Sequence, residues 1–180
     1  MKKFAVFAII IIVAVLLGLL TLKSTNPNSK RQAMIISSSA FNNNDKIPAK
    51  FTCDGGGINP ELIIQNVPAE AKSLAIIMDD PDAPSGTFTH WLVWNIDPKT
   101  ETIKQESVPP GAIEGQNGSG KIGYTGPCPP DGKPHRYFFK LYALNSKILE
   151  AEPIKNKSAL EKIIEPLIIE KTELVGVYER

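Results

Sequence analysis

The sequence predicts a mainly antiparallel β domain that follows one membrane-spanning helix. An uninterrupted apolar run from Phe4 to Leu22 has the length that a helix needs to cross a bilayer, roughly 20 residues. After it, short runs rich in aromatic and β-branched residues alternate with loops rich in glycine and proline, and a helical pattern appears only near the C-terminus. Strands joined by loops, without alternating helices, favour an antiparallel sheet over a parallel α/β fold.

The N-terminal segment is expected to be an uncleaved signal-anchor. Lys2 and Lys3 precede the apolar run and mildly favour a cytoplasmic N-terminus, which would place the rest of the chain outside the cytoplasm. The run is longer than the core of a removable signal peptide and lacks small residues at the spacing of a cleavage site. The alternative is a soluble protein secreted after cleavage. We divide the chain into a signal-anchor (residues 1–23), a polar linker (24–33) and one domain (34–180).

Charge and cysteine content limit the class of protein. The formal net charge is +1, so the chain lacks the basic surface that attracts a phosphate backbone, and nucleic acid is not an expected partner. Cys53 and Cys128 both lie in loops rich in glycine and proline. Outside the cytoplasm a disulfide between them is chemically permitted. Spacing alone does not show that the two loops meet, so two small, partly buried thiols are the alternative.

Four strands are expected in the first half of the domain. They cover residues 34–41, 62–66, 73–78 and 90–96. The first leads into a turn-rich polar stretch, and a valine-proline pair closes the second. The third is a continuous apolar run of strand length, which indicates burial on both faces. The fourth contains two tryptophans and ends at Asp97-Pro98, so we expect it to be central.

A long loop, a strand, a helix and a final strand complete the expected order. Residues 109–131 contain many glycines and prolines, and loops of this length in compact domains are usually functional. Residues 136–144 are rich in aromatics and partly alternate, as strands do. Ser158 and the glutamate three residues later match a capping box at the start of a helix, which Pro166 is expected to kink or interrupt. Residues 173–178 are the last candidate strand.

The segment over residues 79–84 predicts a stiff turn that carries aspartates. Proline after Asp80 pushes that aspartate toward an extended conformation, and Pro81 and Pro84 fix their own φ angles. The carboxylates of Asp80 and Asp82 can therefore be held in fixed directions. A turn with solvated aspartates is the alternative, since Asp and Pro are ordinary turn residues.

The two histidines of the chain, His90 and His135, each border a proline-stiffened loop and an expected strand. A carboxylate, from Asp80 or Asp82, is expected to hold the His90 ring, raise its pKa and leave it as a donor. Together these groups predict one pocket for a phosphate or carboxylate, in which an aspartate could also hold the amine of a zwitterionic head group. Buried rings with ordinary partners are the alternative. The candidate ligand-binding residues are Asp80, Asp82, His90, Gly126, His135 and Tyr137.

Catalytic interpretations of the same residues are weaker. Asp80, Asp82, His90 and His135 could form the metal site of a hydrolase or lyase, but they have no helical ligand spacing. Ser85 or Thr87 lacks the nucleophile elbow of a hydrolase. Residues 115–122 nearly fit a phosphate-binding loop, but isoleucine stands where a serine or threonine is required. We therefore expect no catalytic residue, no metal and no cofactor.

From about Ile35 to Arg180 the chain resembles the phosphatidylethanolamine-binding protein family, specifically its bacterial and archaeal Raf-kinase-inhibitor-like branch. The resemblance rests on residues 79–84, 90–96, 123–130, 135–137 and 173–178. It implies a β-sandwich-like core with a peripheral C-terminal helix and a small anion pocket formed by the six residues named above. It also implies that Arg136 braces the loops through a carboxylate.

The combined expectation is a membrane-anchored, extracytoplasmic binding module for a small anionic ligand or phospholipid head group. It could also regulate a partner protein, and inhibition of a protease or kinase through the pocket rim is the alternative role. That role depends on surfaces that a pocket motif does not specify. The membrane anchor is not part of the domain that the family shares.

Overall fold

The computed structural model describes residues 31–149 and 154–180, whose elements confirm the mainly β prediction. In chain order they are β1 (Ile35–Ser38), η1 (Ala49–Phe51), β2 (Leu62–Gln65), β3 (Ser73–Asp80), β4 (Phe88–Ile96), β5 (Thr102–Ile103), β6 (Ile113–Glu114), β7 (His135–Leu144), α2 (Lys157–Ile164), η2 (Glu165–Leu167) and β8 (Ile168–Tyr178). The predicted membrane segment, residues 4–22, lies outside the described ranges. Within those ranges, none of the helices has the length and apolar character needed to span a membrane.

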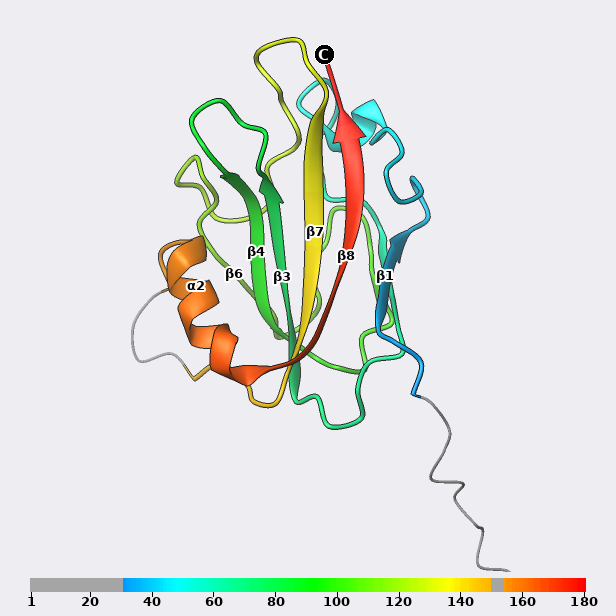
Figure 1. Ribbon diagram of the computed structural model, residues 1–180, viewed down its shortest axis with the longest axis vertical. Helices are drawn as coiled ribbons and strands as arrows, with labels where there is room; N and C mark the ends of the chain where they lie inside the picture. The colour runs from blue at the N-terminus through cyan, green and yellow to red at the C-terminus, as the bar shows by residue number, and fades with distance from the viewer. Residues whose placement is uncertain (1–30, 150–153) are drawn as a thin grey trace, which may run out of the picture. The chain divides into compact units, whose positions relative to one another are not determined.

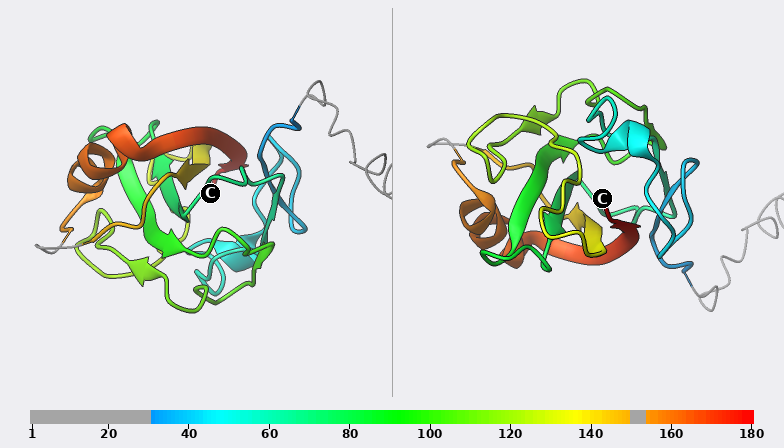
Figure 2. Two further views of the ribbon diagram at one scale, coloured as in Figure 1. Left: turned by 90° about the horizontal axis from the view of Figure 1, so that it is seen from below. Right: turned by 90° about the horizontal axis from the view of Figure 1, so that it is seen from above.

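Two antiparallel sheets and one helix form the layers of the domain. The larger sheet has the strand order β6-β4-β3-β7-β8, and the smaller sheet has the order β1-β2-β5. Apolar side chains of the smaller sheet pack against one face of the larger sheet in a single core. The opposite face of the larger sheet packs on α2 through Leu160 and Ile164. Figures 1 and 2 show α2 and β1 on opposite sides of the larger sheet, which matches the predicted sandwich with a peripheral C-terminal helix.

The central strand β3 brings the predicted site residues to one end of the larger sheet. All eight of its residues are buried, as its continuous apolar run predicts. Asp80 lies opposite Phe88 of β4, and Asp79 lies opposite Phe138 of β7. Because both neighbours are antiparallel to β3, its end lies beside their beginnings. The loops that contain the predicted site residues therefore gather at that end (Figure 1).

The predicted start of the helix was wrong by two residues. Asn156 is the N-cap, and its side chain accepts a hydrogen bond from the backbone N–H of Ala159 at 2.9 Å. Ser158 lies inside α2 instead, because asparagine caps a helix as well as serine does. The predicted interruption is confirmed, since α2 ends at Ile164 and Pro166 belongs to the 3-10 turn η2.

The last strand is longer than its sequence pattern indicates. β8 begins at Ile168 rather than at residue 173, and it pairs with β7 along almost its whole length. Residues 168–172 show only partial burial, so their side chains give little strand signal. Backbone pairing with β7 places them in the sheet, because tertiary context overrides local strand propensity.

Gly176 of β8 pairs with Tyr137 of β7, and its missing side chain leaves space that core side chains fill. A Cβ atom at position 176 would lie 2.5 Å from Cγ1 of Ile47 and 2.8 Å from a ring carbon of Phe41. Such distances are shorter than van der Waals contact. The absence of a side chain at this position therefore lets Ile47 and Phe41 pack against the strand.

We expect Gly176→Ala to lower the free energy of unfolding by about 1–3 kcal/mol, because an extra methyl group overpacks the core. Gly56→Ala is the matched control, since a Cβ there meets no atom closer than 3.4 Å, and its free energy of unfolding should stay within about 0.5 kcal/mol of wild type. Chemical denaturation measures both variants. Equal stability of the two variants would contradict the packing argument.

Candidate functional site

A cavity of about 280 Å³ lies at the end of the larger sheet, where β3 ends and β4 and β7 begin. Asp80, His90, Gly126 and His135 line it together with the loop over residues 83–86. The volume lies near the lower limit of small-molecule sites, about 300 Å³, and suits a small ligand rather than a large one. Four of the six predicted site residues are thus brought together.

Asp80 and His135 form a buried hydrogen-bonded pair. Nδ1 of His135 lies 2.8 Å from Oδ2 of Asp80, and the two side chains are 2% and 5% exposed, respectively. The other carboxylate oxygen of Asp80 accepts a hydrogen bond from the backbone N–H of Asp82 at 2.8 Å. This bond closes the turn that Pro81 stiffens.

Both nitrogens of His135 face carboxylates, since Nε2 lies 3.2 Å from Oδ1 of Asp131. An ionised carboxylate only accepts hydrogen bonds, so these two partners favour a positively charged ring with a proton on each nitrogen. Burial by itself lowers the pKa of His135, but hydrogen bonds and charges from Asp80 and Asp131 outweigh it and raise the pKa above 6.5. His135 is therefore the positive group of the cavity.

His90 has a different partner, and its pKa is shifted in the opposite direction. Its Nδ1 lies 2.8 Å from the carbonyl oxygen of Thr125, and a carbonyl only accepts, so Nδ1 carries a proton. Burial lowers the pKa of His90 below 6.5, despite smaller contributions from Thr125 and Asp80 that raise it. The prediction that Asp80 or Asp82 holds this ring and raises its pKa was wrong, because both carboxylates have other partners.

Tyr137 lies behind the cavity wall, against both imidazoles. Its ring centre is 5.2 Å from that of His90 and 6.5 Å from that of His135. In the part of the chain that the structure describes, its buried hydroxyl has no acceptor for its proton. Burial, followed by the charge of Asp80, raises the pKa of Tyr137 and outweighs the opposing effect of the backbone N–H of Cys128, so the hydroxyl keeps its proton and can donate.

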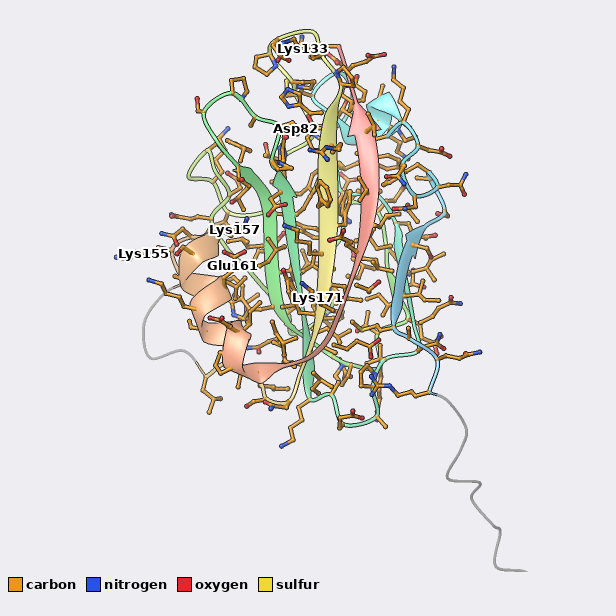
Figure 3. All side chains as sticks on the ribbon, in the orientation of Figure 1. Asp82, Lys133, Lys155, Lys157, Glu161 and Lys171 are labelled. Carbon is orange, nitrogen blue, oxygen red and sulfur yellow. A yellow bond between two sulfur atoms is a disulfide. The ribbon has the colours of Figure 1, made fainter. Side chains whose placement is uncertain are left out.

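Asp82 is not part of the cavity wall. Its carboxylate accepts hydrogen bonds from Nε and Nη2 of Arg136 at 2.8 and 2.7 Å, which lower the pKa of Asp82 to about 2. Arg136 therefore braces the loop through a carboxylate, as the family resemblance implied. Figure 3 shows Asp82 toward the same end of the sheet as Lys133, away from the helix residue Lys157. Asp82 positions the turn after β3 rather than facing a ligand.

The loop before β7 is tied to the segment around η1. Cys53 and Cys128 are joined by a disulfide bond with their Cα atoms 5.4 Å apart, and Cys128 lines the cavity. The backbone N–H of Cys53 also donates to the carbonyl of Pro127 at 3.0 Å. A Cβ at Gly126 would lie 2.9 Å from the carbonyl oxygen of Phe51, so this close approach requires glycine.

Sequence reasoning missed two groups of the site, Thr125 and Asp131. Thr125 acts through its backbone carbonyl, which every residue has, so no sequence signal marks it. Asp131 precedes Gly132 and resembles an ordinary turn residue. Its spacing of four residues from His135 is the one signal that could have suggested their contact.

Other features of the described residues were considered as sites. A depression of about 700 Å³ is lined by residues 63–67 and 98–102, but none of the buried polar side chains of residues 31–149 and 154–180 lies there. Across the same ranges, no group of three or more His, Cys, Asp or Glu side chains is arranged to hold a metal ion. The smaller cavity has the concentration of buried polar groups that a binding site requires.

Comparison with known sequences agrees with the fold. A family profile described as phosphatidylethanolamine-binding protein matches residues 37–179. A UPF0098 protein of Pyrococcus horikoshii is 52% identical over 150 residues, which cover 79% of this chain and 75% of the relative. A UPF0098 protein of Methanothermobacter thermautotrophicus is 44% identical over 152 residues, which cover 82% of this chain and 99% of the relative.

Two solved structures share the architecture. CT736 of Chlamydia trachomatis, described as a phosphatidylethanolamine-binding protein homologue, has a TM-score of 0.77 and 40% identity over 82% of this chain and 98% of its own. E. coli YbcL is described as a new member of the mammalian phosphatidylethanolamine-binding protein family. It has a TM-score of 0.77 and 28% identity over 83% of this chain and 99% of its own. The fold is the β-sandwich with a peripheral C-terminal helix that these binding-protein homologues share. The chain belongs to the phosphatidylethanolamine-binding protein family, in its bacterial and archaeal branch.

We expect the two histidines to titrate on opposite sides of the ordinary imidazole pKa of about 6.5, His135 above and His90 below. Asp131→Asn removes a negative charge and should lower the pKa of His135 while changing that of His90 little. Asp97→Asn, in a turn that does not line the cavity, is the control. NMR titration of the ring protons measures these values. Two histidines with the same pKa would contradict the assigned partners.

The pKa shifts also set the sign of the pH dependence of stability. His135, whose folded pKa is raised, contributes stability below its unfolded pKa and loses it as the pH rises through the folded pKa. His90, whose folded pKa is lowered, contributes stability above its unfolded pKa and loses it as the pH falls through the folded pKa. The combined contribution of the two rings is therefore greatest between their folded pKa values.

Proposed function

We propose that the protein is a membrane-anchored binding module whose cavity holds a small phosphate-bearing or carboxylate ligand, such as a phospholipid head group. The observation that carries the proposal is unused hydrogen-bonding capacity at one cavity. Among the described residues, the buried hydroxyl of Tyr137 has no acceptor for its proton, and His90, which lines the cavity, is hydrogen-bonded through Nδ1. Buried polar groups are normally paired, so unpaired groups beside a cavity are expected where a ligand supplies the missing partner.

His135 provides the positive charge for an anion. Its bond to Asp131 is longer than its bond to Asp80, at 3.2 Å against 2.8 Å, and the Asp131 side chain is 33% exposed. An anionic ligand can replace the exposed carboxylate at Nε2, whereas the buried Asp80 keeps the ring in place. Binding then exchanges one carboxylate partner of His135 for a ligand oxygen.

The family name supports the phosphate class of ligand. The profile that matches residues 37–179 is described as binding phosphatidylethanolamine, a lipid whose head group contains a phosphate. The cavity volume of about 280 Å³ suits that head group better than its acyl chains. No chemical step is needed for this role.

Tyr137→Phe should weaken binding of inorganic phosphate and of O-phosphoethanolamine about tenfold, because it removes a donor that the ligand uses. The same change should leave the free energy of unfolding unchanged or higher, since the hydroxyl finds no acceptor for its proton among the described residues. Tyr142→Phe is the matched control, because Tyr142 packs on the opposite face of β7. Calorimetric titration and denaturation measure the two effects. If the wild-type protein binds neither compound saturably, the proposed function fails.

The anchoring part of the proposal assigns residues 4–22 to the membrane and the domain to the extracytoplasmic side. The disulfide between Cys53 and Cys128 supports that side, because such bonds persist in oxidising compartments.

Deletion of residues 1–30 should move the protein from the membrane fraction to the soluble fraction, because the apolar run is removed. Deletion of residues 24–30 alone is the control and should leave the protein in membranes. Fractionation with an alkaline wash distinguishes the two. A full-length chain in the soluble fraction would contradict the anchor, and a chain shortened near residue 23 would favour the secreted alternative.

A further inference from the structure

The disulfide bond between Cys53 and Cys128 lies between two exposed residues. A buried structural disulfide is shielded from thiols, whereas an exposed one is reduced more readily and belongs to the labile or regulatory kind. A thiol in solution can therefore approach these two residues without unfolding the protein.

A positive charge lies beside one of the two sulfur atoms. Nη1 of Arg180 is 3.8 Å from Sγ of Cys128. Asp54 holds the guanidinium there, because its Oδ1 lies 3.3 Å from Nε of Arg180 and its Oδ2 accepts a hydrogen bond from Tyr178 at 2.7 Å. A neighbouring arginine favours the thiolate form of a cysteine. When the bond opens, Cys128 is therefore the sulfur that leaves more easily as an anion.

Cys53 has less favourable surroundings for a thiolate. It directly precedes Asp54, and a neighbouring carboxylate disfavours a second negative charge. Thiol–disulfide exchange proceeds by attack of a thiolate on one sulfur and departure of the other, and the more stable thiolate leaves faster. The sulfur that is attacked is therefore that of Cys53.

Hydrogen bonds also tie together the two segments that the disulfide joins. The backbone N–H of Cys53 donates to the carbonyl oxygen of Pro127 at 3.0 Å. The hydroxyl of Tyr124 donates to the carbonyl oxygen of Phe51 at 2.9 Å. Neither bond involves a sulfur atom, so both remain when the disulfide opens. The two cysteines therefore stay close enough for the disulfide to form again.

We propose that this disulfide is a site of reversible modification by low-molecular-weight thiols, which become attached to Cys53 while Arg180 stabilises the departing thiolate of Cys128. The small thiol loses its proton to solvent, and its sulfur forms a bond to Sγ of Cys53. The bond between the two cysteine sulfurs breaks, and its electron pair goes to Cys128. In the reverse step the Cys128 thiolate attacks Cys53 and expels the small thiol. This site is separate from the anion-binding function proposed above.

Glutathione is the probe, and iodoacetamide traps the released cysteine. The full-length folded protein is incubated with both, and mass spectrometry of its peptides locates the two adducts. We expect glutathione on Cys53 and the alkyl group on Cys128. Urea at concentrations that leave the protein folded should not change the rate, because the exchange needs no unfolding.

Arg180→Gln should slow formation of the mixed disulfide at least about threefold, because Cys128 becomes a poorer leaving group. It should also raise the pH at which alkylation of the released Cys128 reaches half its maximal rate. Arg180→Lys keeps the positive charge and should restore both values toward those of wild type. Lys133→Gln is the matched control, since Lys133 is an exposed residue that bonds Asp131 through its backbone N–H, and both values should stay unchanged.

Denatured protein separates the role of Arg180 from an effect on folding. In guanidinium chloride the guanidinium no longer lies beside Cys128, so wild type and Arg180→Gln should exchange at equal rates. Resistance of the folded wild-type protein to glutathione, at concentrations that open the bond in denatured protein, would overturn the proposal. Glutathione on Cys128 instead of Cys53, or equal rates for folded wild type and folded Arg180→Gln, would overturn the role of Arg180.

Discussion

Asp80 and His135 hold each other inside the loop end of the larger sheet, and the geometry of the cavity follows from that pair. Their bond of 2.8 Å joins the last residue of β3 to the first residue of β7, in addition to the backbone pairing of the two strands. Breaking a buried charged pair by removing one partner is strongly destabilising, because it leaves an uncompensated charge. The ring of His135 is therefore held in position by the protein alone, with its Nε2 directed toward Asp131.

The two histidines show how the partner of a side chain decides its chemistry. His135 faces two carboxylates that raise its pKa, whereas His90 faces a carbonyl inside an apolar wall and burial lowers its pKa. The two imidazoles that line the cavity therefore differ in the direction of their pKa shifts.

The sequence was a good guide where one strong local signal decides the structure. The apolar run before Asp80 and the tryptophan-rich run after His90 predicted β3 and β4, and the proline-stiffened turn predicted where the aspartates lie. Partner choice could not be predicted, because it depends on which loop reaches the site in three dimensions. Arg136 reaches Asp82, and the carbonyl of Thr125 reaches His90, although neither contact leaves a pattern in the sequence.

The predicted starts of β8 and α2 were wrong for a related reason. The start of β8 is fixed by pairing with β7 rather than by its own side chains, and the start of α2 is fixed by Asn156, whose side chain accepts from the N–H of Ala159. The disulfide could be predicted only in part. Both cysteines were visible as loop residues, but only the fold shows that the two loops meet.

Two neighbouring aspartates of β3 serve opposite faces of the larger sheet. Asp79 pairs with Lys140 and with Lys157 of α2, whereas Asp80 faces the cavity. Side chains alternate along a strand, so a shift of one residue would turn each carboxylate to the wrong face. Insertion or deletion of a single codon within β3 would therefore undock the helix and dismantle the cavity at once. The length of β3 is therefore fixed by two unrelated requirements, the contact with α2 on one face of the sheet and the cavity on the other.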